Sequence, residues 1–154
     1  MSRELDIFSD GACSGNPGPA SIGIVFKEHG ATVKTISRPI GHATNNIAEY
    51  TAITHALEEA RKLDASQLTV HTDSELLFNQ LKGTFKIKSD HLKVLHQEWQ
   101  KLVKFFKRVE VRRIPREQNQ EADRLAKQAL QAKTSQDGDP DVFVIGEESP
   151  SSKG

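Results

Sequence analysis

Four acidic side chains stand where they can bind a divalent cation together. Asp10 and Asp73 each follow a short apolar run typical of a β-strand, whereas Glu49 and Asp123 each lie in the first turn of a segment with helical periodicity. In open α/β sheets, ligands gather at the carboxyl ends of the strands, where helix N-termini also point. If the two strands are neighbours, the four carboxylates share one crevice. They would repel one another unless a hard cation with oxygen ligands, Mg²⁺ before Mn²⁺ or Ca²⁺, neutralises them.

Each acid taken alone has a plainer structural interpretation. Asp10-Gly11 is a common turn, Asp73-Ser74 is a common cap, and an acid is favourable near any helix N-terminus. The convergence of all four acids in one topology favours the metal site. No spacing of ligands suits zinc, because the six histidines are scattered and Cys13 is the single cysteine.

The elements that position these acids follow from the periodicity of apolar residues. Alternation and short apolar runs predict strands at 4–9, 20–28, 31–38, 67–72 and 109–114. Three- and four-residue repeats predict helices at 46–63, 75–81, 92–106 and beyond the N-cap Asn119. A hairpin turn is expected at His29-Gly30, and the segment 15–19 is expected to be a loop rather than part of a central strand.

This order, β-β-β-α-β-α-α-β-α, predicts an α/β protein with a mixed sheet and helices packed on it. The connection through the first helix is long enough for a crossover, which places the strand at 67–72 parallel to an earlier strand. We expect one folded domain at 1–133 and a polar, turn-forming tail at 134–154 with a composition typical of disorder. The apolar island 142–145 in this tail is expected to dock on the domain, and the alternative is that it binds a partner chain.

The composition is that of a soluble globular chain with an uneven charge distribution. Of the 154 residues, 36% are hydrophobic and 27% are charged. No stretch approaches 18 apolar residues and the N-terminus has no signal-peptide core, so we expect a cytoplasmic protein without a membrane partner. The net charge is −4 over 1–80, +8 over 81–133 and −4 over 134–154. Metal-binding carboxylates beside a polyanion-binding surface produce this pattern, and solvated helix faces produce it equally well.

Four segments carry the acids in the order and spacing of a known family. They are 8–20 (Phe-Ser-Asp-Gly-Ala-Cys-Ser-Gly-Asn-Pro-Gly-Pro-Ala), 44–50 (Thr-Asn-Asn-Ile-Ala-Glu-Tyr), 72–74 (Thr-Asp-Ser) and 119–126 (Asn-Gln-Glu-Ala-Asp-Arg-Leu-Ala). On these motifs the chain resembles type 1 ribonuclease H over residues 5–131. The resemblance implies a mixed five-stranded sheet with helices on both faces. It also implies a monomeric endonuclease that hydrolyses the RNA strand of RNA–DNA hybrids.

The resemblance assigns roles to the acids. Asp10, Glu49, Asp73 and Asp123 are implied to be catalytic metal ligands, with two Mg²⁺ or Mn²⁺ ions per site when substrate is bound. In this arrangement Asp10 bridges the two ions, and Asp73 and Asp123 complete the two sides. Glu49 holds one ion and approaches the ribose 2′-OH, the group that distinguishes RNA from DNA.

Further residues near the acids are implied to contact the hybrid. The asparagines are expected to contact minor-groove edges and sugars, the threonine to hold a phosphate of the DNA strand, and the cysteine to line the same groove. Loop and helix-cap roles are the alternative for the asparagines, and a plain small apolar role is the alternative for the cysteine. The expected contacts in this group are Gly11, Cys13, Asn16, Thr44, Asn45 and Asn46.

One departure from the best-known bacterial pattern concerns the middle of the chain. That pattern carries a long, tryptophan-rich basic protrusion, which is replaced here by the short interval 82–92. Lys82, Lys86 and Lys88, together with Phe85, are expected to supply a smaller grip on the substrate backbone. This shorter form resembles the archaeal and plant-like branch of the family.

A second departure concerns the loop before the last acid. The family often places a histidine there, but the segment 114–118 contains none. Arg116 is expected to take its place by contacting the scissile phosphate. Glu75 stands where many members carry a glutamine.

Two other functions fit the same scaffold. A nuclease of this kind can also accept double-stranded RNA, as some relatives with short protrusions do. A hybrid-binding module without catalysis is the non-enzymatic alternative, although such a module has no need of four mutually repelling carboxylates.

Overall fold

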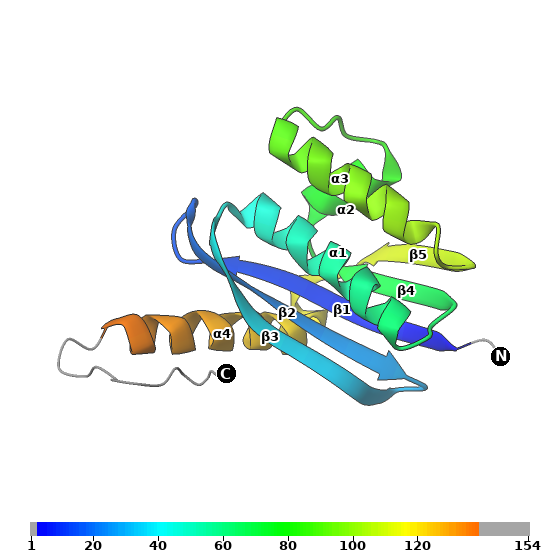
Figure 1. The fold of residues 1–154 in the computed structure, drawn as a ribbon, viewed down its shortest axis with the longest axis horizontal. Coiled ribbons are helices and arrows are strands. Elements are labelled where there is room, and N and C mark those ends of the chain that lie inside the picture. The colour runs from blue at the N-terminus through cyan, green and yellow to red at the C-terminus, as the bar shows by residue number, and fades with distance from the viewer. Residues whose placement is uncertain (1–2, 139–154) are drawn as a thin grey trace.

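The computed structural model describes residues 3–138, and its elements follow the predicted order (Figure 1). The strands are β1 (Glu4–Cys13), β2 (Gly18–Glu28), β3 (Ala31–Ala43), β4 (Gln67–Thr72) and β5 (Arg108–Arg113). The helices are α1 (Asn45–Lys62), α2 (Glu75–Lys82), α3 (Asp90–Val103), the short 3₁₀ helix η1 (Arg116–Gln118) and α4 (Gln120–Gly138). The predicted strands and α-helices are therefore confirmed in kind and order.

The five strands form one mixed sheet in the order β3-β2-β1-β4-β5. β2 pairs antiparallel with both β1 and β3, whereas β4 lies parallel to both β1 and β5. The connection through α1 therefore makes the predicted crossover, because it brings β4 beside β1. The last parallel pair of β1 and β4 is Phe8 with His71. Asp10 and Asp73 each lie two residues further along, so they reach the same edge of the sheet on the same face.

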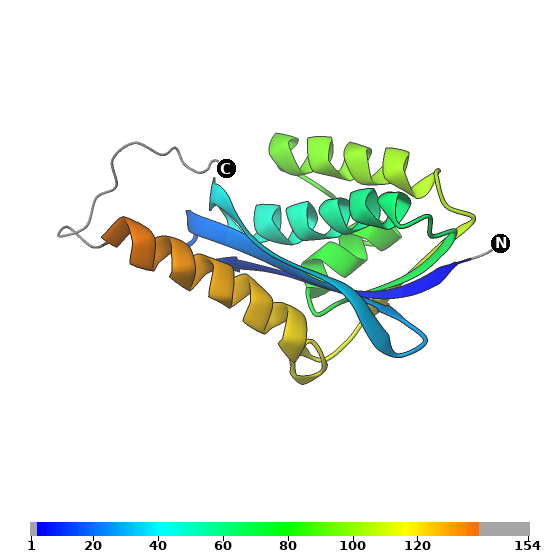
Figure 2. The ribbon, with the colours of Figure 1, turned by 60° about the horizontal axis from the view of Figure 1, so that its bottom comes forward.

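Helices cover both faces of the sheet, as expected (Figure 2). α1, α2 and α3 lie on one face, and α4 lies on the other, across β1, β2 and β3. The core between α1 and the sheet contains fully buried apolar side chains such as Ile7, Phe26, Ile53 and Leu57. Burial of one such side chain stabilises a fold by roughly 1.5–3 kcal/mol. This packing holds α1, which carries Glu49, against β1, which carries Asp10.

α4 approaches the sheet closely at Gly23 of β2. A Cβ atom at this position would lie 2.1 Å from the carbonyl oxygen of Ala122 and 2.5 Å from the backbone nitrogen of Ala126, so a larger residue would push the helix away. The buried Ser21 hydroxyl on the same strand donates a hydrogen bond to the Ala126 carbonyl. These contacts anchor the first turns of α4, where Asp123 lies, to the centre of the sheet.

Some strand boundaries differ from the prediction. β1 continues to Cys13 instead of ending before Asp10, because its antiparallel ladder with β2 extends to the pair of Cys13 with Ala20. β2 accordingly begins at Gly18, so Gly18 and Pro19 belong to a strand and their assignment to the loop was wrong. Proline is accepted here because it lies at the very start of the strand.

The last helix runs through Gly138, past the predicted domain boundary at 133, so the first residues of the predicted tail are helical rather than turn-forming. The prediction that 142–145 dock on the domain lies outside the described residues. Between residues 3 and 138, no helix is both long enough and apolar enough to cross a membrane.

Candidate active site

Three of the four acids meet at one edge of the sheet. Carboxylate oxygens of Asp10, Glu49 and Asp73 lie within 4.8 Å of one another, close enough for one cation to contact all three residues. Asp73 directly follows β4, as predicted, whereas Asp10 lies inside β1 rather than at its end. Glu49 lies in the second turn of α1 rather than the first, because Thr44 is the N-cap and the helix begins one residue earlier than predicted.

Asp123 reaches the same site from the first turn of α4. It shares a hydrogen bond with Asp10, and its Oδ2 atom forms an ion pair of 3.1 Å with Lys127 one turn later. Partial burial acts to raise the pKa of Asp123, but the pKa is lowered overall because Asp10 and Lys127 stabilise the carboxylate. The fourth acid therefore lies beside the group of three and interacts with it through Asp10.

Burial dominates the electrostatics of Asp10 and Glu49. Burial raises the pKa of Asp10 to about 9, and the neighbouring Glu49, Asp123 and Asp73 add to this shift. Burial likewise raises the pKa of Glu49 to about 8, with a further contribution from Asp73, while a hydrogen bond from the Gly11 N–H acts in the opposite direction. Without a cation, both buried carboxyl groups therefore hold a proton at neutral pH.

The residues of the site fit a hard divalent cation. The ligand atoms of the three clustered acids are all oxygens. The Oε1 atom of Glu49 is buried and has no hydrogen-bond partner within the described part of the chain. A buried carboxylate oxygen without a partner is costly, and coordination to a cation satisfies it. An all-oxygen set of this kind suits Mg²⁺ or Mn²⁺ rather than zinc.

Asn119 belongs to the site in a way that the sequence did not reveal. It directly precedes α4, but the prediction that its side chain caps the helix is wrong, because Oδ1, the atom that would accept a backbone N–H, has no hydrogen-bond partner among the described residues. Its Nδ2 amide instead donates to the Ser9 carbonyl and to Oδ2 of Asp73, each at 3.0 Å. The signal for it in the sequence was its place in the motif 119–126. An asparagine directly before a helix is expected to cap it, so the local sequence gives no sign of the contact with Asp73.

Gly11 lets the two halves of the site approach each other. A Cβ atom at Gly11 would lie 2.5 Å from the carbonyl carbon of Ala48 and 2.7 Å from the backbone nitrogen of Glu49. The lack of a side chain therefore allows α1 to lie close to β1, so that Glu49 meets Asp10. The expected contact of Gly11 with substrate stays a prediction.

Four of the predicted substrate contacts surround the start of α1. Thr44 caps the helix, since its Oγ1 atom accepts a hydrogen bond of 3.2 Å from the Ile47 N–H. Oδ1 of Asn16 accepts a hydrogen bond of 3.0 Å from the Asn45 N–H and so ties the loop after β1 to the helix. The side chains of Asn45 and Asn46 are exposed. The structure thus brings these residues together beside the helix that carries the second acid.

Of the other predicted contacts, Cys13 lies beside the start of α1, whereas the lysines and Arg116 lie elsewhere. The Sγ atom of Cys13 donates to a backbone carbonyl at the end of β3, at 2.8 Å. Lys86 and Lys88 are exposed in the connection between α2 and α3. Arg116 is exposed at the start of η1, and its charge acts to lower the pKa of Glu49 against the effect of burial. Arg116 therefore lies near enough to influence the charge of Glu49, whereas the two lysines lie on a separate segment.

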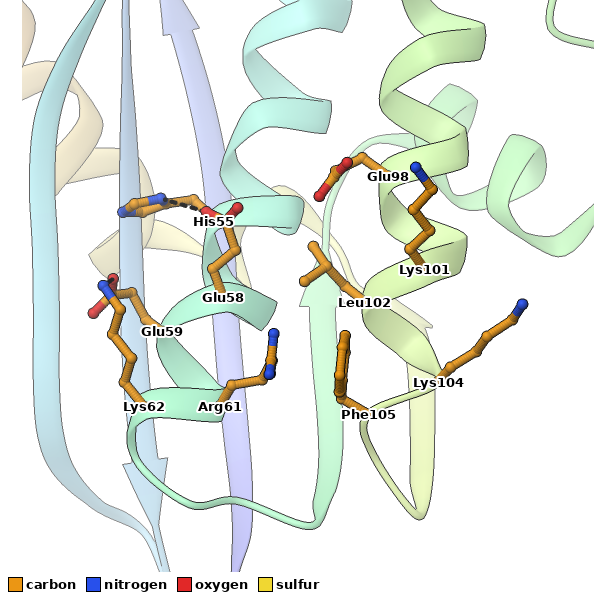
Figure 3. Close-up of a pocket in the computed structure, with 10 residues that line it drawn as sticks. All are labelled: His55, Glu58, Glu59, Arg61, Lys62, Glu98, Lys101, Leu102, Lys104 and Phe105. Carbon is orange, nitrogen blue, oxygen red and sulfur yellow. Dashed lines mark hydrogen bonds and ion pairs between the residues drawn. The ribbon is translucent and has the colours of Figure 1, made fainter.

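A groove of about 940 Å³ between α1 and α3 is distinct from this site (Figure 3). Its lining comes from residues 55–62 of α1 and from 98–105 at the end of α3 and beyond. Arg61 and Phe105 face each other there, with the guanidinium carbon 3.5 Å from the centre of the ring. Because α1 carries Glu49 near its beginning and the groove near its end, the acids and the groove occupy different parts of the molecule.

Comparison with known proteins supports a single family. A family model described as reverse transcriptase-like matches residues 8–129. A bifunctional protein of Mycobacterium tuberculosis is 38% identical over 153 residues, which cover 96% of this chain and 42% of that protein. The RNase H1 structure of the archaeon Halobacterium salinarum is 35% identical, with a TM-score of 0.82, and the match covers 84% of this chain and 98% of the other. LC11-RNase H1, solved in complex with an RNA/DNA hybrid, is 34% identical, with a TM-score of 0.80 and the same coverage of both chains.

The chain thus spans less than half the length of the mycobacterial relative but nearly the whole of the two solved domains. The similarity to the archaeal RNase H1 fits the expected resemblance to the archaeal branch. Fold, acidic site and comparisons lead to the same conclusion: the chain belongs to the type 1 ribonuclease H family.

Proposed function

We propose that this chain is an endoribonuclease that hydrolyses the RNA strand of RNA–DNA hybrids. The observation that carries the proposal is the meeting of Asp10, Glu49 and Asp73 within 4.8 Å, beside the end of β4. A relative of 34% identity that was solved with an RNA/DNA hybrid supports the same substrate class. A silent binding module fits less well, because a surface for a polyanion gains nothing from clustered, partly buried carboxylates.

The four acids are proposed to hold two divalent cations, Mg²⁺ or Mn²⁺, when substrate is bound. Asp10 would bridge the two positions, Asp73 and Asp123 would complete the two sides, and Glu49 would hold one ion next to the ribose 2′-OH. Cations held there activate a water nucleophile and stabilise charge on the leaving oxygen. Asp10 and Glu49 must give up the protons that burial retains on them, so binding is linked to pH.

The polar residues around the start of α1 are proposed to orient the hybrid. Exposed amides suit minor-groove edges and sugars, and a threonine hydroxyl at a helix N-terminus suits a phosphate of the DNA strand. Because these groups surround the helix that carries Glu49, they would present the 2′-OH of the RNA strand to that acid. The proposed contacts are Gly11, Cys13, Asn16, Thr44, Asn45 and Asn46.

Cleavage of matched duplexes tests the proposal. An end-labelled RNA–DNA hybrid, double-stranded RNA and double-stranded DNA of the same sequence are incubated with the protein in Mg²⁺, in Mn²⁺ and in EDTA. We expect internal cuts in the RNA of the hybrid with either cation and none in EDTA. Cleavage of double-stranded RNA at a comparable rate would show the broader nuclease. Binding of the hybrid without cleavage in either cation would show the silent module and overturn the proposal.

The lysines around the connection between α2 and α3 are proposed to contact substrate phosphates. They are Lys82, Lys86, Lys88 and Lys93. Replacing all four with glutamine should raise KM more than it lowers kcat, because the residues act on binding and not on the reacting bond. The slope of log Kd against log salt should also flatten by about 0.7–0.9 for each phosphate that a lysine no longer neutralises.

The matched control for these lysines neutralises four exposed lysines at the far ends of α1 and α3. They are Lys62, Lys101, Lys104 and Lys107. The control should retain the wild-type salt slope. A slope that stays unchanged in the first quadruple variant would show that its lysines are only a solvated face.

Arg116 is proposed to contact the scissile phosphate in place of the missing histidine. Arg116→Ala should lower kcat by up to about 10²-fold, since a fixed positive charge near the transferring phosphate acts mainly in the transition state. The Mg²⁺ concentration for half-maximal activity should change little. Arg113→Ala, which removes an exposed arginine from the end of β5, is the control. Wild-type turnover in Arg116→Ala would show that the loop 114–118 only connects β5 to α4 and that Arg116 takes no part in catalysis.

We also propose that the protein acts as a monomer in the cytoplasm, with its catalytic domain at 1–133 and a tail at 134–154, into whose first residues α4 continues. Cys13 is a half-buried free thiol that donates a hydrogen bond to a backbone carbonyl, and a free thiol is compatible with a reducing compartment. Sedimentation of the full chain, with and without hybrid, tests the monomeric state.

A further inference from the structure

Asn119 connects three parts of the catalytic site through one buried side chain. The residue is 1% exposed. Its Nδ2 atom donates both to the carbonyl of Ser9 on β1 and to Oδ2 of Asp73 after β4. Its own backbone carbonyl accepts a hydrogen bond of 3.1 Å from the N–H of Asp123 in the first turn of α4. One asparagine therefore touches the strand that carries the first acid, the third acid itself and the helix that carries the fourth.

The direction of this amide is determined by its partners. The Ser9 carbonyl and the Asp73 carboxylate can only accept hydrogen bonds, so the NH₂ group of Asn119 must face them. Its Oδ1 atom then points away, is buried, and has no hydrogen-bond partner among residues 3–138. An asparagine that served as a helix cap would use this oxygen to accept a backbone N–H. The side chain thus makes no hydrogen bond that caps α4 and instead donates to Asp73.

We infer that Asn119 is a positioning residue that presets the Asp73 carboxylate for a divalent cation. This inference rests on the proposed function. In the metal-free protein, no cation holds the Asp73 carboxylate beside Asp10 and Glu49, so its side chain would otherwise be free to rotate away from them. The hydrogen bond from Asn119 opposes that rotation and keeps Asp73 within the cluster. A carboxylate already in place loses less freedom when a cation binds, which strengthens the binding.

The test compares Asn119→Ala with Ser21→Ala. Both variants remove a buried hydrogen bond that fastens α4 to the sheet, but the Ser21 hydroxyl bonds the Ala126 carbonyl and touches none of the acids. Mn²⁺ binding is measured without substrate from the electron paramagnetic resonance signal of the free ion. Asn119→Ala should raise the Kd for Mn²⁺ by roughly 10- to 100-fold, the range for outer-shell partners of metal ligands. Ser21→Ala should leave this Kd at the wild-type value.

Cleavage of the hybrid provides the second readout. The Mn²⁺ concentration for half-maximal cleavage by Asn119→Ala should shift upward with the Kd, and excess Mn²⁺ should restore most of the activity. If Asn119→Ala does not fold, Asn119→Ser serves in its place. The serine hydroxyl partly fills the space that alanine would leave empty, but it is too short to reach both Ser9 and Asp73. The same weakening of Mn²⁺ binding is therefore expected.

The outcomes separate this inference from the proposed function. Equal Kd values for Mn²⁺ in the wild type and the Asn119 variant would overturn the inference, whatever the activity. Equal losses of affinity in Asn119→Ala and Ser21→Ala would also overturn it, because they would reflect loosening of α4 in general. A wild type that binds Mn²⁺ but does not cut the hybrid would contradict the proposed function. In that case the Kd values for Mn²⁺ of the wild type and the Asn119 variant would still decide whether Asn119 positions Asp73.

Discussion

Asp10→Asn is expected to abolish RNA cleavage while the fold and hybrid binding survive. The amide keeps the shape of the carboxyl group but removes a negative charge from the centre of the site, where Glu49 and Asp73 lie within 4.8 Å. Turnover of a labelled hybrid in excess Mg²⁺ should fall by more than about 10²-fold, the loss typical of removing one preorganised electrostatic contact. Fluorescence anisotropy in the same buffer should show hybrid affinity close to that of the wild type.

The same substitution is expected to stabilise the metal-free protein at neutral pH. Burial raises the pKa of Asp10 from 3.8 to about 9, so the wild type must take up a proton on folding whereas asparagine needs none. Thermal unfolding in EDTA should therefore give a higher Tm for the variant at pH 7 and nearly equal values near pH 4. A catalytic loss that came from misfolding would lower the Tm instead.

Asp6→Asn is the matched control for this variant. Asp6 lies on β1, four residues before Asp10, and its side chain is 53% exposed. The control should retain wild-type turnover and Mg²⁺ dependence. Cleavage by Asp10→Asn at close to the wild-type rate would rule out the assignment of Asp10 as a metal ligand.

The framework of the site could be predicted because hydrophobic periodicity reports burial. Ile53 and Leu57 recur at a helical interval and are fully buried against the sheet, so both the helix and its inner face are visible in the sequence. The acids stand next to such elements, and the crossover rule brings the strands before Asp10 and Asp73 together. The order and spacing of the four motifs then identified the family.

The parts that escaped prediction depend on contacts between distant segments. β1 extends through Asp10 because β2 pairs with it, and the residues of β1 alone contain the turn-like Asp10-Gly11. The amide of Asn119 turns toward Ser9 and Asp73, which lie 110 and 46 residues away in the chain. A local pattern reports the preferences of neighbouring residues, so it carries no signal for either contact.

A large loss of stability with rising pH is the second expected result for the metal-free protein. Burial raises the pKa of Asp10 from 3.8 to about 9 and that of Glu49 from 4.5 to about 8. In the unfolded chain both groups ionise near their ordinary values. Between about pH 4 and pH 9 the folded state therefore binds more protons than the unfolded state, and stability falls as pH rises. Each group contributes a slope of up to about 1.4 kcal/mol per pH unit.

The lowered pKa of Asp123 has the opposite effect on stability, and this effect falls below the range of pH 4 to pH 9. Its stabilising effect is present above its ordinary value of 3.8 and is lost as pH falls below it. The metal-free protein should therefore be most stable near pH 4–5 as far as the site is concerned. Above about pH 9 Asp10 and Glu49 are ionised in both states, and their contribution stops changing.

Excess Mg²⁺ should remove most of this fall, because a cation bound by the folded state replaces the protons that burial retains. Tm is measured across pH 4–9 in EDTA and in Mg²⁺, with the Asp10→Asn variant alongside. In EDTA the wild type should show the steeper decline and the variant a shallower one, since only Glu49 still titrates within the window. Added Mg²⁺ should raise the Tm of the wild type most at the alkaline end. Superimposable profiles of wild type and variant in EDTA would show that Asp10 does not carry the raised pKa, and they would contradict the burial of its carboxyl group beside Glu49 and Asp73.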